Sequence, residues 1–291
     1  MNSMDKKNIV FNIDQNYLYP LLVAIDSIQD NNNLSDFKIT ILSVDLSLES
    51  KKIIKKLFDT EVEVVEIGHL IPNNLPKNMF YTKTVYAKMF LERVFSCNGK
   101  FLYLDPDIIV KDDLNYLFNI DLLDYPLAAV QSPTSPEFGA FYGVPYWREI
   151  GAHPRTKYLN SGVMLIDYKK WTDLNIIDKS FEHNKKFFTK IKIADQDFIN
   201  VIINGNFLNL PTRWNQETPM RIASMGHQGY MVRSYEEIEE AVKNPAIVHF
   251  TGAMEGRSKP WLKNNLDPLE SEWLHRRSLI KSRIKNIIQM V

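Results

Sequence analysis

Two aspartates stand one residue apart directly after a short apolar segment, in the stretch Phe101-Leu102-Tyr103-Leu104-Asp105-Pro106-Asp107. The four apolar residues predict a buried strand, which delivers both carboxylates to its end. Hard divalent cations prefer oxygen ligands, and an Asp-x-Asp turn offers two while it leaves coordination positions open for phosphate oxygens. We therefore interpret the stretch as a metal site that clamps a diphosphate. The alternative is a solvated loop with a proline at its bend, which turn propensity alone favours.

A histidine in a similar setting lies far along the chain. His249 stands at the end of an apolar segment, 246–250, that predicts another strand. A neutral imidazole is an acceptable ligand for Mn²⁺, so His249 is the candidate third ligand if its strand ends at the same crevice. The alternative is a core or edge histidine with other partners. Further on, Lys259 is suited to neutralising phosphate charge as a compact ammonium.

The elements that must position these residues alternate between strands and helices. We expect strands at 8–13, 37–44, 61–67, 101–104, 162–166 and 246–250, and helices after Pro20 and at 49–58, 84–95 and 194–203, the last capped by Asp195. The alternation predicts an α/β fold with a mainly parallel sheet, in which ligands lie beyond the carboxyl ends of the strands. Region 132–157 contains four prolines and several aromatic residues. It predicts an irregular insertion that shapes a cleft.

Composition limits the classes of protein that fit. With 291 residues, 45% of them hydrophobic and 24% charged, the chain is typical of a globular protein with one main core. Thirty-five basic and 35 acidic residues give a formal net charge of zero, so we expect no nucleic-acid partner. A single cysteine, Cys97, excludes an intramolecular disulfide framework, and the first 14 residues lack the apolar stretch of a signal peptide. We therefore expect a cytoplasmic protein.

The last segment, 270–291, is basic after Glu272 and interleaves lysine and arginine with leucine and isoleucine. This pattern predicts a basic amphipathic helix. One interpretation is that the helix lies on an anionic membrane surface, which would make the protein peripheral at the inner membrane face. The other is that it packs its apolar side on the core and leaves the basic residues in water. We expect the chain to divide into a main domain at 1–265 and this tail at 266–291.

Five segments in series resemble the family 8 retaining glycosyltransferases, which include bacterial lipopolysaccharide galactosyl- and glucosyltransferases and, more distantly, glycogenin. The segments follow the family's order over residues 8–261: NIVFNIDQNY at 8–17, LYLDPDIIV at 102–110, LNSGVMLI at 159–166, ADQD at 194–197, and HFTG at 249–252 with KPW at 259–261. The resemblance implies a single Rossmann-like nucleotide-binding domain of the GT-A type. It also implies transfer of galactose or glucose from a UDP-sugar to a glycan, glycolipid or protein-linked acceptor, with retention of configuration.

The resemblance further implies how the donor is bound. Asp105, Asp107 and His249 would hold Mn²⁺, with Mg²⁺ as the alternative ion. The residues matched to the nucleotide are Asp14 and Asn16 at the uracil and ribose, Tyr17 stacked on the base, and Gly252 and Lys259 at the diphosphate. The segment from Gly252 to Lys259 is several residues longer than the compact version found in the family, which bears on Lys259 more than on His249.

On the sugar side, the resemblance implies that Asn160, Asp195 and Gln196 surround the transferred hexose. Lys88 stands where the family usually has an arginine near the phosphates and sugar, and a lysine lacks the bidentate geometry of arginine. An amide is a poor nucleophile, so Gln196 opposite the leaving group favours front-face substitution over a covalent intermediate. In that mechanism Gln196 and Asp195 stabilise an oxocarbenium-like sugar.

Other chemistries lack their sequence signatures. The chain has no G-x-G-x-x-G after its first strand, no P-loop, no H-E-x-x-H and no C-x-x-C. An NDP-sugar nucleotidyltransferase would also use acidic metal ligands, but it is expected to carry a Gly- and Lys/Arg-rich loop where this chain has DQNY at 14–17. A catalytically silent protein that binds a sugar nucleotide or glycan is the alternative of a different class. Candidates to line an acceptor cleft, or simply to hold the loops by packing, are Tyr142, Tyr146, Trp147, Trp214 and Met220.

Overall fold

The structure is a computed structural model that describes residues 6–58, 60–76, 82–224, 234–251, 259–262 and 267–289. Within these residues, seven strands form one sheet in the order β3-β2-β1-β4-β7-β6-β8. They are β1 (Lys7–Asp14), β2 (Phe37–Val44), β3 (Glu61–Glu66), β4 (Lys100–Leu104), β6 (Leu127–Gln131), β7 (Leu159–Asp167) and β8 (Leu208–Asn209). Only β7 runs antiparallel to its neighbours, β4 and β6. The predicted α/β fold with a mainly parallel sheet is confirmed.

A smaller sheet lies at the end of β4. Its central strand β10 (Ile247–His249) pairs antiparallel with β5 (Ile108–Val110) and parallel with β9 (Gln216–Glu217). Residues 105–107 alone separate β4 from β5, so this short loop joins the two sheets. In the register of β10 and β5, His249 lies opposite Ile108, the residue after Asp107. The junction of the two sheets therefore brings the acidic pair and the histidine together.

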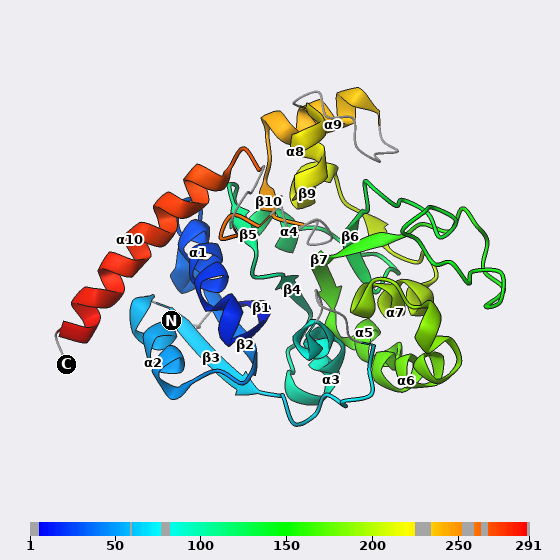
Figure 1. Cartoon of the computed structure of the whole chain (residues 1–291), viewed down its shortest axis with the longest axis horizontal. Helices are drawn as coiled ribbons and strands as arrows, with labels where there is room; N and C mark the ends of the chain where they lie inside the picture. The colour runs from blue at the N-terminus through cyan, green and yellow to red at the C-terminus, as the bar shows by residue number, and fades with distance from the viewer. Residues whose placement is uncertain are drawn as a thin grey trace.

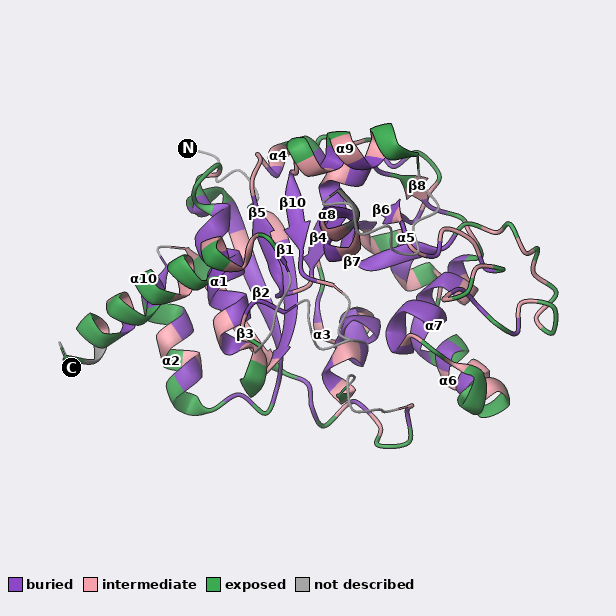
Figure 2. Cartoon of the chain, turned by 45° about the horizontal axis from the view of Figure 1, so that its top comes forward, coloured by how far each residue is buried: buried purple, intermediate pink, exposed green. Residues whose placement is uncertain are grey.

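Helices cover both faces of the large sheet (Figure 1). Each face of the large sheet has its own hydrophobic core, and successive residues of β1 point into different ones. Ile9 and Phe11 pack with α1 (Leu18–Ile28) on one face, and Val10 packs on the opposite face. The remaining helices are α2 (Leu48–Leu57), α3 (Leu91–Val94), α4 (Asn115–Phe118), α5 (Tyr168–Asp173), α6 (Ile176–Phe187), α7 (Ala194–Ile203), α8 (Thr218–Ser224), α9 (Tyr235–Lys243) and α10 (Glu270–Gln289). Figure 2 shows that the central strands are mostly buried, whereas the edge strand β3 has no buried residue.

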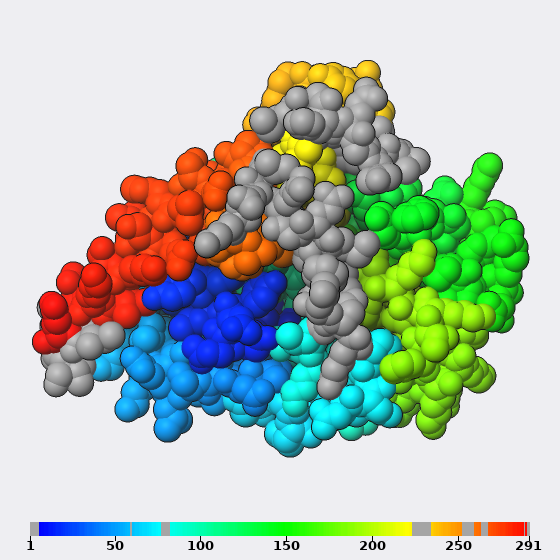
Figure 3. Space-filling view, viewed as in Figure 1, coloured from blue at the N-terminus to red at the C-terminus, as the bar shows by residue number. Residues whose placement is uncertain are grey.

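The basic C-terminal helix, α10, packs on the body of the molecule, where it runs beside α1 and α2 (Figures 1 and 3). Trp273, Ile280 and Ile284 are buried in the same core as α1. Arg276 and Arg283 both form ion pairs with Asp26 of α1. Of the two arrangements that the sequence left open, the structure therefore has the one in which α10 packs on the core. Among the described residues, no helix is long and apolar enough to cross a membrane.

Three local predictions are tested directly by the backbone. The expected helix at 84–95 is mostly a 3₁₀ helix, η3 (Lys83–Phe90), followed by the short α3. The predicted cap by Asp195 is wrong, because the N-cap of α7 is Ile193 and Asp195 lies inside the first turn. Instead, the carboxylate of Asp197 reaches back and accepts hydrogen bonds from the backbone amides of Lys192 and Ile193. Region 132–157, described throughout, contains neither helix nor regular strand, as predicted.

Candidate functional site

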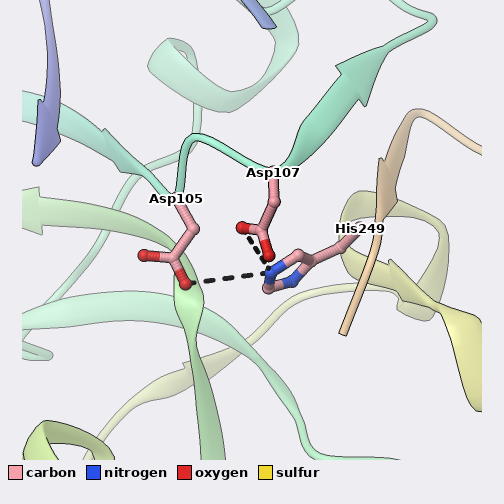
Figure 4. A group of neighbouring side chains, drawn as sticks. All are labelled: Asp105, Asp107 and His249. Carbon is pink, nitrogen blue, oxygen red and sulfur yellow. Dashed lines mark ion pairs between the residues drawn. The ribbon is translucent and has the colours of Figure 1, made fainter. Parts of the chain in front are cut away.

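The predicted metal ligands meet at the junction of the two sheets (Figure 4). Asp105 and Asp107 lie in the loop between β4 and β5, and His249 ends β10. One ligand atom from each residue lies within 4.8 Å of the other two. His249 Nε2 is 3.4 Å from Asp107 Oδ1 and 3.8 Å from Asp105 Oδ2. Asp107 and His249 are buried, and Asp105 is partly open to solvent, so a bound ion would have one accessible side.

Backbone hydrogen bonds and one glycine fix this geometry. The Asp105 amide donates to the carbonyl oxygen of Gly162 on β7 at 2.8 Å, and the Phe250 amide donates to the carbonyl oxygen of Asp107 at 2.9 Å. A Cβ atom at Gly162 would lie 2.2 Å from His249 Cε1 and 2.9 Å from Asp105 Oδ2. No side chain fits there, so glycine at this point of a buried strand is what lets the imidazole approach the carboxylates.

Lys88 of η3 links the predicted metal ligands to the residues predicted on the sugar side. Its buried ammonium donates to Asp105 Oδ1 at 3.1 Å and lies 3.0 Å from Asp195 Oδ2. Burial alone disfavours the charged form, but the carboxylates of Asp105 and Asp195 outweigh it and raise the pKa of Lys88 above its usual value. The Tyr103 hydroxyl also donates to Asp105 Oδ1, at 2.6 Å. Because Oδ1 is engaged twice, Oδ2 is the oxygen of Asp105 that faces His249.

Lys259 donates a hydrogen bond to one carboxylate oxygen of Asp107, as Lys88 does to Asp105. Its buried ammonium donates to Asp107 Oδ2, whereas Oδ1 is the oxygen that lies 3.4 Å from His249 Nε2. Burial favours the neutral acid, but the Lys259 ammonium, with the imidazole of His249 beside it, outweighs burial and holds the pKa of Asp107 well below its usual value. With a neutral imidazole at His249, the carboxylates of Asp105, Asp107 and Asp195 around the junction face two ammonium groups, those of Lys88 and Lys259. One negative charge is left uncompensated, a balance that suits a cation.

The residues predicted on the sugar side gather between β7 and α7. Asp195 Oδ2 accepts from the Ser161 hydroxyl at 3.2 Å, and Gln196 Oε1 accepts from the Ser161 amide at 3.1 Å. Asn160, also buried, precedes Ser161 on β7. Ala194 has φ 34°, a left-handed backbone that is strained for a residue with a Cβ. Ala194 is the first residue of α7, and the first turn that follows it holds Asp195 and Gln196 against Ser161 of β7.

The residues predicted for the nucleotide lie after β1. Asp14 Oδ1 accepts from the Asn16 amide at 3.0 Å, and Asn16 itself is exposed. The ring of Tyr17 meets Trp261 edge to face, with centroids 5.7 Å apart. Burial raises the pKa of Tyr17, and the charges of Lys259 and Asp107 act on the same phenol. The structure thus places Tyr17 near the predicted diphosphate and metal residues. Gly252 lies outside the described residues.

The five aromatic and methionine side chains considered for an acceptor cleft do not form one group. Tyr146 is buried and stacks on Phe187, Trp214 belongs to the core beside α1, and Met220 packs against α9. Tyr142 and Trp147 are half-buried in the irregular insertion. The packing alternative therefore holds for Tyr146, Trp214 and Met220.

Two buried residues of the site were not predicted. Asn215 Oδ1 lies 2.8 Å from His249 Nδ1 and can accept a hydrogen bond from it. Arg221 of α8 donates to the carbonyl oxygen of His249 at 3.2 Å and pairs with buried Asp267 just before α10. Both contacts join residues far apart in the chain, and neither residue stands in a pattern that marks it. Gly162 did carry a signal, since glycine inside a strand indicates close approach.

Comparison with known proteins agrees with this geometry. The family model for glycosyl transferase family 8 matches residues 8–265. General stress protein A of Bacillus subtilis is 26% identical over 284 residues, which cover 94% of each chain. A lipopolysaccharide 1,2-glucosyltransferase of Escherichia coli K12 is 25% identical over 269 residues, 90% of this chain and 75% of the relative. The solved galactosyltransferase LgtC, in complex with donor and acceptor sugar analogs, has the same fold, with a TM-score of 0.76, 24% identity, and 94% and 95% of the two chains covered. With a family match over nearly its whole length, the chain belongs to glycosyl transferase family 8.

Proposed function

We propose that this glycosyltransferase transfers a hexose, galactose or glucose, from a UDP-hexose to a saccharide-bearing acceptor, with retention of configuration and with Mn²⁺ as its metal. The observation that carries the proposal is the convergence of Asp105, Asp107 and His249 within 4.8 Å. The relatives support the substrate class, because one is named a glucosyltransferase and the solved LgtC is a galactosyltransferase with bound donor and acceptor analogs.

The donor atoms fit a divalent cation. Two carboxylate oxygens suit Mn²⁺ or Mg²⁺, and the imidazole nitrogen favours Mn²⁺ over the harder Mg²⁺. One divalent ion would convert the uncompensated negative charge at the junction into a net positive one, which attracts a diphosphate. When bound, the ion supplies Lewis-acid stabilisation of the charge that grows on the diphosphate as UDP leaves.

The chain's own residues bind and orient the donor in this proposal. Asp14, Asn16 and Tyr17 hold the uridine, and Lys259 with Gly252 contacts the diphosphate. Asn160, Asp195 and Gln196 surround the hexose, with Lys88 between the sugar and phosphate sides. The carboxylate of Asp195 and the amide oxygen of Gln196 stabilise the positive charge that develops on the sugar. The acceptor hydroxyl attacks from the face that UDP leaves.

The test is release of UDP by the purified full-length chain. With UDP-galactose or UDP-glucose, release is expected when Mn²⁺ is added and not when a chelator replaces it. Asp107→Ala removes a buried metal ligand and should reduce release to the level of the blank. Asp173→Ala is the matched control, because this exposed aspartate pairs only with Lys169 on the surface among described residues, and it should behave as the wild type.

Two results would count against the proposal. If neither UDP-sugar raises the melting temperature of the protein with or without Mn²⁺, the donor assignment is wrong, since a bound ligand stabilises the folded state. If UDP-sugars bind but stay intact with every acceptor and with water, the alternative of a catalytically silent sugar-nucleotide-binding protein is supported.

A further inference from the structure

A line of buried hydrogen bonds connects His249 to the backbone of β7. The Gly162 amide donates to Asn160 Oδ1 at 2.9 Å. The side-chain nitrogen of Asn215, Nδ2, donates to the same Asn160 Oδ1 at 2.9 Å. Asn215 Oδ1 then lies 2.8 Å from His249 Nδ1. All of these side chains are buried, and Asn215 is 0% exposed, so water does not offer alternative partners.

The direction of every bond in this line follows from its first donor. A backbone N–H can only donate, so the Asn160 atom that it meets must be the carbonyl oxygen. That oxygen can only accept, so the Asn215 atom facing it must be the NH₂ group. The other end of the Asn215 amide is therefore its oxygen, which in turn requires a proton on His249 Nδ1. Neutral imidazole carries one ring proton, so Nε2 is left with its lone pair.

Nε2 is the atom that faces Asp105 and Asp107. The opposite tautomer would direct an N–H at the metal position and leave two lone pairs, on Nδ1 and on Asn215 Oδ1, facing each other in a sealed site. Leaving a buried acceptor without its donor costs about 1–3 kcal/mol. The opposite tautomer could offset this only through Nε2–H and Asp107 Oδ1, and their 3.4 Å separation is long for a hydrogen bond, whereas the Asn215 contact is 2.8 Å. Rotating the ring is blocked on one side, because its Cε1 already lies against Gly162.

We propose that Asn215 is a positioning residue that holds His249 as the Nδ1–H tautomer, so that the Nε2 lone pair faces the two carboxylates before any metal arrives. The inference rests on the proposed metal site and adds to it the residue that prepares the third ligand. Partners of this kind that hold the outer nitrogen of a metal-binding histidine typically contribute 10–100-fold to metal affinity. Asn215 lies 34 residues from His249 in sequence.

The first experiment uses the metal-free wild-type protein. Two-bond ¹H–¹⁵N spectra of the ¹⁵N-histidine-labelled chain distinguish the two neutral tautomers and the protonated ring for each of its six histidines, and are recorded at about pH 8.5, about two units above the ordinary pKa of histidine. The spectrum of His249→Gln identifies the signals of His249. The expected result is a protonated Nδ1 and an unprotonated Nε2. A protonated Nε2 in the wild type would overturn the proposal without any further variant.

The second experiment compares Asn215→Ala with Asn184→Ala, a buried asparagine on α6 that controls for the loss of any buried amide. For Asn215→Ala we expect the His249 signals to shift toward the Nε2–H tautomer and calorimetry to show Mn²⁺ binding weakened by about 10–100-fold. Asn184→Ala should keep both properties. An Asn215→Ala protein that folds and retains the tautomer and the Mn²⁺ affinity would overturn the proposal.

These results separate this inference from the proposed function. Failure of the wild type to bind Mn²⁺ at all would count against the metal assignment, whatever the tautomer of His249. Wild-type binding that Asn215→Ala leaves unchanged would count only against Asn215. If Asn215→Ala does not fold, the wild-type spectrum decides the question alone.

Discussion

At the scale of single residues, the site is organised by two buried lysines that each hold one carboxylate of the proposed metal site. Lys88 engages Asp105 Oδ1, and Lys259 engages Asp107 Oδ2. In both cases the oxygen that remains points toward His249. The lysines therefore orient the ligands, but their positive charges also oppose the arrival of a metal cation.

This opposition gives a prediction with a definite sign. Lys259→Met replaces the ammonium by a neutral side chain. This variant should bind Mn²⁺ alone more tightly than the wild type, by about 10-fold or more. The reason is that two unit charges about 4 Å apart interact by roughly 4 kcal/mol near a protein surface. The same variant should bind UDP more weakly, since it lacks a cation for the diphosphate. Calorimetric titrations with Mn²⁺ and with UDP measure both effects.

Lys169→Met is the control for this comparison, because Lys169 is exposed and pairs with Asp173 at the surface. It should leave both affinities unchanged. Mn²⁺ binding by Lys259→Met that is equal to or weaker than that of the wild type would show that Lys259 orients Asp107 more than it repels the ion.

The sequence was informative about residues that end strands. Asp105, Asp107 and His249 were predicted as one group because each follows a short apolar segment, and the structure brings them together. Asn215 was not predicted, because its contribution is a hydrogen bond to a residue 34 positions away. Nothing in the local pattern around an asparagine specifies which distant atom it meets.

At the scale of elements, hydrophobic periodicity located most strands and helices but not their direction or fine geometry. The bounds of β2 and α7 agree with the expected ranges. The antiparallel direction of β7 was not predicted, because a buried strand is apolar on both faces whichever way it runs. Likewise, the apolar residues of η3 are compatible with an α-helix, and only tertiary packing selects the tighter 3₁₀ form.

The contact between α6 and the irregular insertion predicts a pH dependence. His183 Nε2 lies 3.0 Å from the Tyr146 hydroxyl. Burial and, to a smaller extent, Lys186 lower the pKa of His183 to about 4. Because His183 takes up a proton more easily in the unfolded chain than in the folded one, the free energy of unfolding decreases as pH falls from about 6.5 to 4. Above about pH 6.5 the ring is neutral in both states, and this loss of stability is absent. Since the ring is half-buried, we expect a contribution of about 1–2 kcal/mol.

His183→Phe should therefore gain stability relative to the wild type as pH is lowered from 7 to 4, measured by urea unfolding at each pH. The difference between the two proteins is the quantity to follow, because burial raises the pKa of Asp197 to about 6 and so acts in the opposite direction in both. His275→Phe, on the exposed side of α10, is the control. A constant difference between His183→Phe and wild type across this range would contradict the prediction.

At the scale of the whole molecule, α10 shares its core with the elements that begin the chain. The indole of Trp273 is fully buried beside α1, whereas the next residue, Leu274, is 39% exposed. Removing a buried tryptophan side chain costs about 3–5 kcal/mol, and removing an exposed leucine costs far less. Replacing Trp273 therefore measures how much the packing of α10 contributes to the free energy of unfolding, and replacing Leu274 is the control on the same helix.

Trp273→Ala should lower the free energy of unfolding by about 3–5 kcal/mol, and Leu274→Ala by less than about 1 kcal/mol. Both proteins should unfold in one transition in urea, followed by far-UV circular dichroism and by fluorescence. The division of the chain at residue 265 stays a prediction that this experiment tests. A separate early transition for the helix would favour an independent tail, and a single one would favour a shared core.

The buried ion pair of Arg221 and Asp267 has a consequence for the enzyme as a unit. The guanidinium holds the carbonyl oxygen of His249 on one side and, on the other, the carboxylate that precedes α10. Loosening the carboxyl-terminal end of the protein would thereby displace the strand that carries His249, although none of the predicted metal ligands had been altered. The guanidinium of Arg221 contacts both the strand of His249 and the residue before α10. A change that displaces α10 is therefore expected to lower activity as well as stability.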